Sequence, residues 1–441
     1  MSNESSSNLK KVLSPLMLWG LGVGYVISGM YFGWNLGLKE GGTLGMGIAT
    51  FFVIILYTCF SFSYAELACA IPKAGGVFDY AIKAFGKDIS FIAGISQIVE
   101  FVFAPPAIAF GIGSYFNLAF PNVSVLSTSL MVYFIFTFLN IYGVKAAATF
   151  ELIITIIAVV EILIFAGVTL PHFEFQNLKT NSFPNGWSGV FAALPFAIWF
   201  FLGIEGLANV AEEAKSPQKD IQRSFGFVLI TLVILCILVF LSSIGVGGWE
   251  NIVYTNLASG ETSDSPLPMA MRMVVGDQTL LFHLLLTIGI FGLIASFNGL
   301  ILAAGRATYE FGKVGYAPNF LGIVHPKFKT PAKALVINMG IGIIAIFTNR
   351  TADIITIAVI GALSLYIIAI FSLLKLRAKH PNLYRPYKVP FYPFTPILAL
   401  VLAISSFVAV AVFNAKLFFI YLGILLLSYL LFKLFNKKPS S

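Results

Sequence analysis

The sequence predicts an all-α integral membrane protein with twelve transmembrane helices. Of its 441 residues, 58% are hydrophobic and only 10% are charged, whereas a soluble domain carries roughly 25% charged residues. The hydrophobic residues fall into twelve runs close to the length of about 20 residues that a bilayer span needs. None of the runs alternates as a strand does. This composition disfavours a secreted disulfide scaffold, a disordered chain and a soluble enzyme.

The predicted helices follow one another along the chain and are joined by polar connections. Their approximate bounds are 16–38, 44–71, 89–119, 125–143, 150–170, 190–210, 225–247, 279–303, 332–348, 352–374, 394–413 and 417–435. The two longest connections on the predicted outer side are 171–189 and 248–278, and both carry few basic residues.

The basic residues predict the orientation of these helices. With Lys10 and Lys11 on the cytoplasmic side, almost all of the 27 Lys and Arg residues fall on that side. The outer side holds only Lys39, Lys179, Arg272, Arg350 and Lys416. Because cytoplasmic loops of membrane proteins are enriched in Lys and Arg, both termini are predicted to be cytoplasmic. The net charge of +8 then reflects topology, and no nucleic-acid partner is expected.

Two predicted helices are interrupted at corresponding positions of the two halves. The first contains five glycines between Gly20 and Gly33, and the sixth contains Pro195, Gly203 and Gly206. A break in a membrane helix exposes backbone polar groups, which are tolerated only beside a ligand or a wet cavity. Paired breaks therefore indicate a transporter site between repeats. The alternative for the first helix is close helix packing, since its glycines also fit small-x-x-x-small spacing.

Three acids lie deep inside predicted helices, and no basic residue lies equally deep. A cationic ligand or protons would supply the missing positive charge. Glu100 is the candidate substrate or proton site, while Glu205, in the interrupted stretch FFLGIEG, and Glu161 are candidates for gating or proton coupling. Each could instead be a hydrogen-bonded structural acid. Glu66, near one end of helix 44–71, is expected to be structural and to lie near Lys73.

The motifs of membrane proteases, esterases and ATP-driven pumps are absent from the sequence. Transport by a gradient or by exchange is therefore predicted, without enzymatic activity, cofactor or metal site. Ser296 and Asn298 are the polar residues that a sodium site would use, and two such residues are too few to predict one.

Several segments resemble the amino acid, polyamine and organocation permease superfamily. They are GVGYVISGMYFGWN (22–35), YAELACAIPKAGGVFDYAIKAFG (64–86), FFLGIEGLANVAEEAKSPQKDIQRS (200–224), NGLILAAGRATYEFGKVGYAP (298–318), VHPKFKTPAKAL (324–335) and HPNLYRPYKVPFYPFTPIL (380–398). Within the superfamily, GVGYVISGMYFGWNLGL, EFVFAPPAIAFGIGSYF and KAAATFELIITIIAVVEILIF are most similar to the ethanolamine permease group.

The resemblance implies five plus five inverted helices, followed by two more, with helices 1 and 6 unwound at the centre. The chain would then consist of a cytoplasmic tail (1–15), a first repeat (16–171), a second repeat (190–374), helices 11 and 12 (394–435) and a second tail (436–441).

The resemblance also implies roles for particular residues. In amino acid permeases, backbone N–H groups of the unwound part of helix 1 hold the substrate carboxylate, and the matching triplet here is Ser28, Gly29 and Met30. Methionine in place of the last glycine favours a substrate without a carboxylate. Trp199 matches an aromatic residue that closes over the substrate in some relatives, although an ordinary core aromatic is the alternative.

The coupling mechanism does not carry over from the resemblance. Proton-coupled relatives often have a lysine in helix 5 that reaches toward helix 1, and this chain has none between Glu151 and Leu170. A proton is favoured over sodium as the coupling ion.

The sequence as a whole predicts a secondary active transporter that imports ethanolamine or a related small primary amine by alternating access. It would be a multi-pass protein of the cytoplasmic (inner) membrane. Its expected partners are the lipid bilayer and a small cationic amine, and it could form a homo-oligomer. The predicted substrate-binding residues are Ser28, Gly29, Met30, Glu100, Trp199 and Gly203. The alternative is a proton-coupled or exchanging transporter of zwitterionic amino acids.

Overall fold

The computed structural model describes residues 11–73, 75–143 and 147–435. Residues 1–10 and 436–441, most of the two predicted tails, lie outside this part, as does Lys145. Within it the chain is mostly helical, and its only strands are two short ones in a connection. The prediction of an all-α chain is confirmed.

The α-helices occur in the order α1 (Pro15–Val26), α2 (Ser28–Tyr31), α3 (Leu36–Ala70), α4 (Val77–Phe85), α5 (Lys87–Ala119), α6 (Val125–Tyr142), α7 (Ala147–Thr169), α8 (Phe175–Lys179), α9 (Gly186–Trp199), α10 (Pro217–Gly245), α11 (Glu250–Val253), α12 (Pro266–Val275), α13 (Leu280–Lys313), α14 (Ala332–Phe347), α15 (Thr351–Lys379), α16 (Phe394–Phe413) and α17 (Ala415–Phe435). Three 3₁₀ segments are η1 (Leu170–His172), η2 (Ile204–Glu213) and η3 (Asn319–Gly322). The strands β1 (Tyr254–Asn256) and β2 (Glu261–Thr262) form an antiparallel hairpin.

Ten helical segments of the described chain are long and apolar enough to cross a membrane. One of them, Gly186–Glu213, joins α9 to η2. The shorter apolar helices α1 and α14 occupy the positions of the first and ninth predicted spans, so all twelve predicted spans have helical counterparts. Helix 1 comprises α1, α2 and the first turns of α3, because α3 contains a sharp turn at Gly42 with φ 63° and ψ −171°. The inverted relation of the two repeats stays a prediction.

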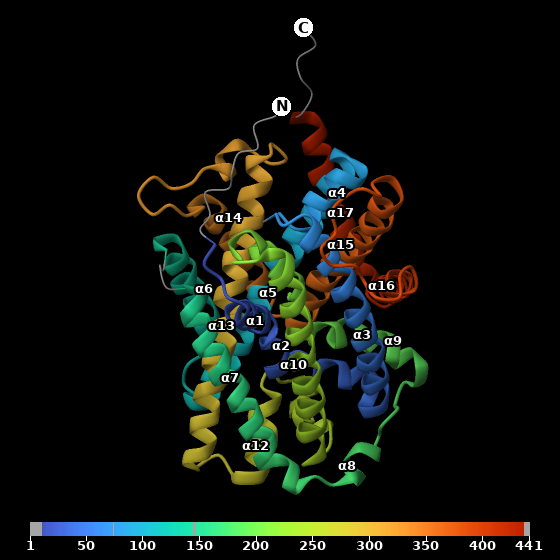
Figure 1. The fold of residues 1–441 in the computed structure, drawn as a ribbon. Helices are drawn as coiled ribbons and strands as arrows, with labels where there is room; N and C mark the ends of the chain where they lie inside the picture. Colours follow the sequence, from blue (N-terminus) through green and yellow to red (C-terminus); the bar gives the residue numbers. More distant parts are fainter. Residues whose placement is uncertain (1–10, 74, 144–146, 436–441) are drawn as a thin grey trace.

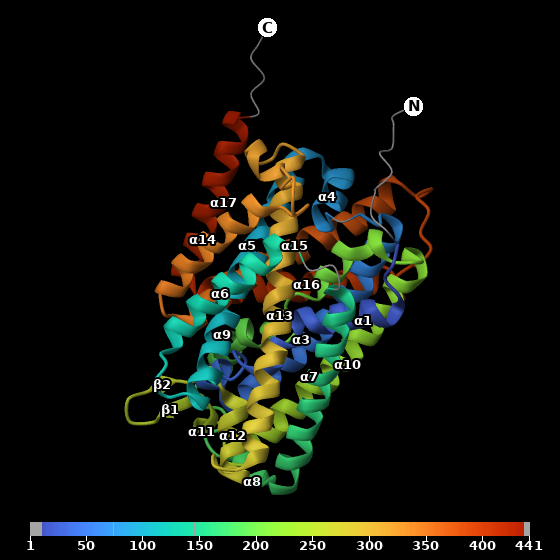
Figure 2. The ribbon, with the colours of Figure 1, turned by 90° about the vertical axis from the view of Figure 1, so that its left-hand side faces the viewer.

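The connections sort to the two ends of the helical bundle. α4 and the last turns of α17 lie at one end, whereas α8, α11, α12 and the β1–β2 hairpin lie at the other (Figures 1 and 2). We call these the basic end and the α12 end. The basic end carries the lysine-containing connections, and there Lys433 of α17 pairs with Asp88 at the start of α5 at 2.6 Å. The long connections 171–189 and 248–278 both lie at the α12 end.

The central helices differ from the outer ones in how completely they are covered. In the most apolar stretch of Gly186–Glu213, 89% of residues are buried, and in α5 and α15 the fraction is 78%. In α17 it is only 17%, which suits a helix that faces lipid. Helix 6, α5 and α15 therefore form the interior of the bundle, where a binding site would be enclosed.

Glu66 lies at the centre of an ion cluster at the basic end of α3. Its side chain is 1% exposed, and its carboxylate accepts hydrogen bonds from Arg377 at 2.5 and 2.8 Å and from the backbone N–H of Val389 at 2.7 Å. Arg385 lies 3.3 Å away. These two arginines, rather than the expected Lys73, are its partners. The cluster fastens the segment after α15 to the end of α3.

We expect Glu66→Gln to destabilise the protein strongly, because it leaves the two arginines without a buried counter-charge. Breaking a buried ion pair costs about 3–5 kcal/mol. The measurement is the apparent Tm of the detergent-solubilised protein. Asp88→Asn is the matched control, since the Asp88–Lys433 pair is about half exposed and such surface pairs contribute roughly 0–1 kcal/mol. Equal Tm values for the two variants would contradict this role for Glu66.

Candidate functional site

Helix 1 is broken at its centre. α1 ends at Val26, and after the single turn of α2 the chain becomes extended at Phe32 (φ −160°, ψ 173°) and adopts a positive φ of 86° at Gly33. The backbone groups in this stretch cannot complete a regular helical ladder, so they are available to a ligand or to neighbouring segments.

The two halves of helix 1 are attached to different segments. Before α1, Leu13 forms a parallel bridge with Ala214, just after η2, at the basic end. After the break, the Asn35 amide donates to the carbonyl oxygens of Ile252 and Ser263 in the connection at the α12 end, at 3.3 and 2.8 Å. Each half therefore has its own anchor at one end of the bundle.

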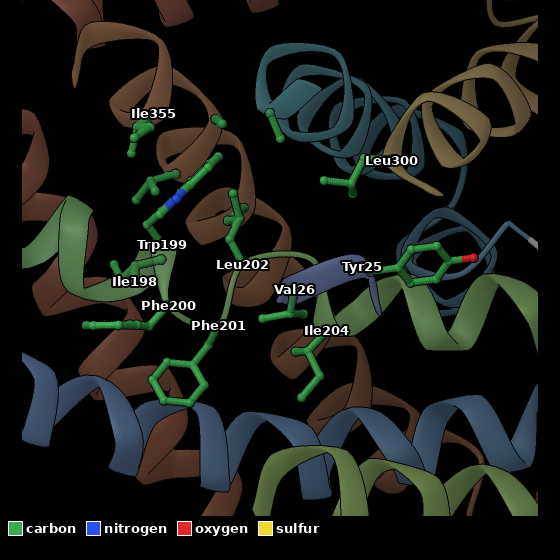
Figure 3. Packing of buried hydrophobic residues seen from close by; sticks show 14 of the residues in the cluster. Tyr25, Val26, Ile198, Trp199, Phe200, Phe201, Leu202, Ile204, Leu300 and Ile355 are labelled. Carbon is green, nitrogen blue, oxygen red and sulfur yellow. The ribbon is translucent and has the colours of Figure 1, made fainter. Parts of the chain in front are cut away.

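Helix 6 is broken beside helix 1. α9 ends at Trp199, Gly203 adopts a positive φ of 99° that favours glycine, and the chain continues as the 3₁₀ segment η2 rather than as an α-helix. Figure 3 shows this break from close by, with Trp199 and Ile355 at one side and Tyr25 and Leu300 at the other. The breaks predicted in helices 1 and 6 are thus both present.

The two breaks touch directly. A methyl group added at Gly29 would collide with the carbonyl oxygen of Trp199. The Trp199 indole donates a hydrogen bond to the carbonyl oxygen of Phe32 at 3.1 Å, and its ring meets the Phe32 ring edge-on. Trp199 therefore spans the gap between the two interrupted helices.

A small central cavity lies at the crossing of the breaks. It is lined by Ser28, Glu100, Phe101, Ala104, Trp199, Leu202, Gly203 and Leu300. Its volume of about 10 Å³ has room for roughly one water molecule. A larger ligand would therefore require the surrounding segments to move apart.

The structure brings together most of the residues that the sequence singled out. Ser28, Glu100, Trp199 and Gly203 line the central cavity, and Gly29 lies beside it against the backbone of Trp199. Met30 is fully buried but does not line the cavity. The Met30 side chain is therefore not part of the cavity wall.

Glu100 is the charged group of the cavity. It is fully buried, and neither of its carboxyl oxygens has a hydrogen-bond partner in the described part of the chain. The carboxyl group of Glu205 lies beside it, close enough for one of the two acids, when protonated, to donate to the other. No Lys, Arg or His among the residues that the structure describes lines the cavity. The site therefore holds acidic groups that lack a protein cation.

Glu205 connects this site to two buried tyrosines. Its Oε2 atom accepts a hydrogen bond from the Tyr366 hydroxyl at 2.9 Å, and the hydroxyl groups of Tyr366 and Tyr57 are 2.9 Å apart. Tyr57 is on α3 and Tyr366 on α15. The 3₁₀ segment after the helix 6 break is thereby held to two neighbouring helices through one carboxylate, a position that suits the predicted gating or coupling role.

Ser296 and Asn298 lie in different environments. The Ser296 hydroxyl is 2.8 Å from that of Ser28 and donates to the carbonyl oxygen of Tyr25 at 2.7 Å. Asn298 instead accepts a hydrogen bond from Asn140 at 2.8 Å. Ser296 thus helps to position the cavity residue Ser28, whereas Asn298 joins α13 to α6.

Glu161 is separate from the central cavity. It lines a second cavity, between α5, α7, α12 and α13, and accepts a hydrogen bond from the Tyr31 hydroxyl at 2.7 Å. Of the three deep acids, Glu100 and Glu205 therefore lie together, whereas Glu161 lies apart from them.

Sequence reasoning missed Glu151 as a buried acid. This residue of α7 is 4% exposed, and its Oε1 atom has no hydrogen-bond partner among the described residues. The same atom would lie 2.6 Å from a methyl group added at Gly24 and 3.8 Å from one added at Gly299. The glycines of α1 and α13 therefore make room for this carboxyl group, and those glycines were the signal that could have revealed it.

Comparison with known proteins agrees with this architecture. A family model described as amino acid permease matches residues 13–429. An uncharacterized transporter of Rhizobium meliloti (strain 1021) is 29% identical over 414 residues, which cover 91% of this chain and 87% of the relative. A branched-chain amino acid permease of Bacillus subtilis (strain 168) is 24% identical over 422 residues, 90% and 88% of the two chains. A low-affinity putrescine importer of Escherichia coli (strain K12) is 25% identical over 360 residues, 78% and 76% of the two chains.

Proposed function

Because the chain belongs to the amino acid permease family, we propose that it is a secondary transporter that imports ethanolamine or a closely related small primary amine by alternating access. Members of this family are transporters rather than enzymes, and their substrates include amino acids and amines. The step to a small amine without a carboxylate is the proposal.

The observation that carries the proposal is the state of Glu100. Its two oxygens are buried beside the acidic Glu205, and no basic residue of the described chain lines the cavity that they face. A buried carboxylate without a counter-charge is costly. An ammonium group is the compensating partner, and it would form charge-assisted hydrogen bonds with Glu100.

Polar backbone and hydroxyl groups around the cavity suit the rest of such a substrate. Pro105 and Pro106 have no N–H, so the carbonyl groups of Phe101 and Val102, four residues earlier in α5, lack their helical donors. Phe101 lines the cavity, and its carbonyl is a further acceptor for an ammonium. The Ser28 hydroxyl, held by Ser296, would pair with the substrate hydroxyl, and Trp199 would cover the site.

Transport by this site requires it to open to each end of the bundle in turn. We place the basic end in the cytoplasm, because Lys and Arg are concentrated there, and the protein in the cytoplasmic membrane. Glu205 is the proposed gating or proton-coupling residue, through its bond to Tyr366. A proton is the proposed coupling ion.

The second candidate is a transporter of zwitterionic amino acids, by proton coupling or exchange. It is favoured by the family and by the branched-chain amino acid permease among the relatives. Such a substrate would use Ser28 and Gly29 for its carboxylate and Glu100 for its ammonium group. The two candidates therefore share the ammonium site and differ in whether the break in helix 1 binds an anion.

Uptake into proteoliposomes separates the two candidates. We expect radiolabelled ethanolamine to accumulate, and unlabelled ethanolamine to block this uptake better than alanine or glutamate does. Imposed pH and sodium gradients are applied separately, and accumulation that follows the pH gradient alone supports proton coupling. Liposomes without protein are the control. If alanine or glutamate were accumulated and competed better than ethanolamine, the amine proposal would be wrong and the second candidate would replace it.

A further inference from the structure

A second cavity lies beneath α12 and shares no lining residue with the central cavity. Its volume is also about 10 Å³. α5, α7, α12 and α13 all contribute to its wall, which includes Tyr115, Glu161, Phe165, Met271, Phe282 and Leu285. Glu161 is the one charged residue among those that line it, so the cavity is an apolar space with a single acid.

The geometry of Glu161 leaves this acid with only one hydrogen bond. Its side chain is 3% exposed, and Oε2 accepts from the Tyr31 hydroxyl at 2.7 Å. Its other oxygen, Oε1, has no donor in the part of the chain that the structure describes. Among the described residues, no basic side chain lines the cavity. As in the central cavity, a cation is the partner that would satisfy a buried carboxylate here.

The remaining wall suits a hydrocarbon group next to that cation. The aromatic rings of Tyr115, Phe165 and Phe282 can face an ammonium or a methylene group favourably. The present volume has room for roughly one water molecule, so a hydrocarbon group would require the wall to move, and Met271 is the most adaptable side chain in it. The central cavity differs, because the Ser28 hydroxyl and the backbone groups at the helix break give it a more polar wall.

The second cavity is directly connected to the broken part of helix 1. Tyr31 is the last residue of α2, and its carbonyl oxygen accepts a hydrogen bond from Tyr115 at 2.9 Å. Glu161 and Tyr115 both line the cavity and both hold Tyr31. A ligand that pairs with Glu161 would therefore compete with, or reorient, the bond that steadies the helix 1 break.

We propose that this cavity is a second binding site, for a monoamine that carries a short hydrocarbon group. The ammonium pairs with Glu161, and the hydrocarbon packs against Phe165, Met271 and Leu285 beneath α12. Through Tyr31, occupancy of this site affects the segment that also lines the central cavity. The proposal goes beyond the proposed function and holds whichever substrate the central cavity takes.

Thermal stabilisation of the purified protein by n-butylamine tests this site without a transport assay. The Glu100→Gln protein is used so that the central carboxylate does not contribute. At saturating n-butylamine we expect its apparent Tm to rise by about 3 °C or more, because a ligand that binds only the folded state stabilises it. The neutral n-butanol, matched in length, should not raise it. In Glu100→Gln/Glu161→Gln the rise should disappear.

A second variant keeps the test decisive if Glu161→Gln does not fold. Met271→Trp fills the cavity from α12 and leaves Glu161 in place, and it should also abolish the rise in the Glu100→Gln background. The proposal would be overturned if n-butylamine did not raise the Tm of the Glu100→Gln protein. It would also be overturned if n-butylamine raised the Tm of all the variants equally. This test does not depend on ethanolamine transport, because it measures binding of n-butylamine directly. A failure of ethanolamine uptake would therefore not count against the second site.

Discussion

Glu100→Gln is expected to lower ethanolamine uptake by about 100-fold at substrate concentrations below KM. The amide keeps the shape of the side chain but replaces a charged acceptor by a neutral one, and hydrogen bonds to charged groups contribute about 1.5–3 kcal/mol. A loss of roughly 2.7 kcal/mol corresponds to this factor of 100. Because Glu100 is buried without a partner, no protein cation is left unpaired by the change. Initial rates in proteoliposomes give the measurement.

Two comparisons make this result specific to the cavity. Glu174→Gln changes an exposed glutamate at the α12 end and should transport like the unaltered protein. Glu100→Gln should also elute as a monodisperse peak in gel filtration with an unchanged or higher Tm, since it removes a buried, uncompensated acid. Undiminished uptake by a well-folded Glu100→Gln protein would remove Glu100 from the substrate site.

Gly29→Ala is expected to reduce transport by more than tenfold and to lower the Tm. The added methyl group would collide with the carbonyl oxygen of Trp199, and the next atoms that it would meet also belong to the backbone of Trp199 and Phe200. Backbone cannot rotate away as a flexible side chain can, so helices 1 and 6 must separate. Overpacking of this kind costs about 1–3 kcal/mol. Uptake and thermal unfolding are measured on the same preparation.

The same substitution at Gly340 is the matched control for this prediction. Gly340 lies in α14, and a methyl group there would meet nothing within 4 Å. Alanine should stabilise that helix by up to about 1 kcal/mol through its higher helix propensity, with uptake unchanged. If Gly29→Ala behaved like Gly340→Ala, the two breaks would not need to touch for transport.

Sequence reasoning could predict the central cavity because its residues break general rules of membrane helices. Glycines and a proline in spans 1 and 6, and an acid in span 3, are all unfavourable in lipid unless they line a site. Ser28, Glu100, Trp199 and Gly203 were singled out on these grounds or by resemblance, and they line one cavity. Met30 was included because it completes the triplet with Ser28 and Gly29 that the resemblance implies, and it does not line the cavity.

The partners of the acids could not be predicted in the same way. Glu151 and Glu161 lie on one helix, but ten residues place them roughly 15 Å apart along its axis and on different faces. One faces glycines of α1 and α13, and the other faces the second cavity. Likewise, the approach of Glu205 to Glu100 depends on the 3₁₀ path after Gly203, and periodicity in the sequence does not encode that path.

The separate anchors of the two halves of helix 1 have a mechanical consequence. The first half is attached through Leu13 to the end of η2, while the second half is attached through Asn35 to the connection at the α12 end. Helix 1 is interrupted between Val26 and Gly33, and its two halves are held by different segments. In the proposed transport cycle, one half of helix 1 could move while the other half stays attached, so the cavity would open toward one end of the bundle and remain closed toward the other.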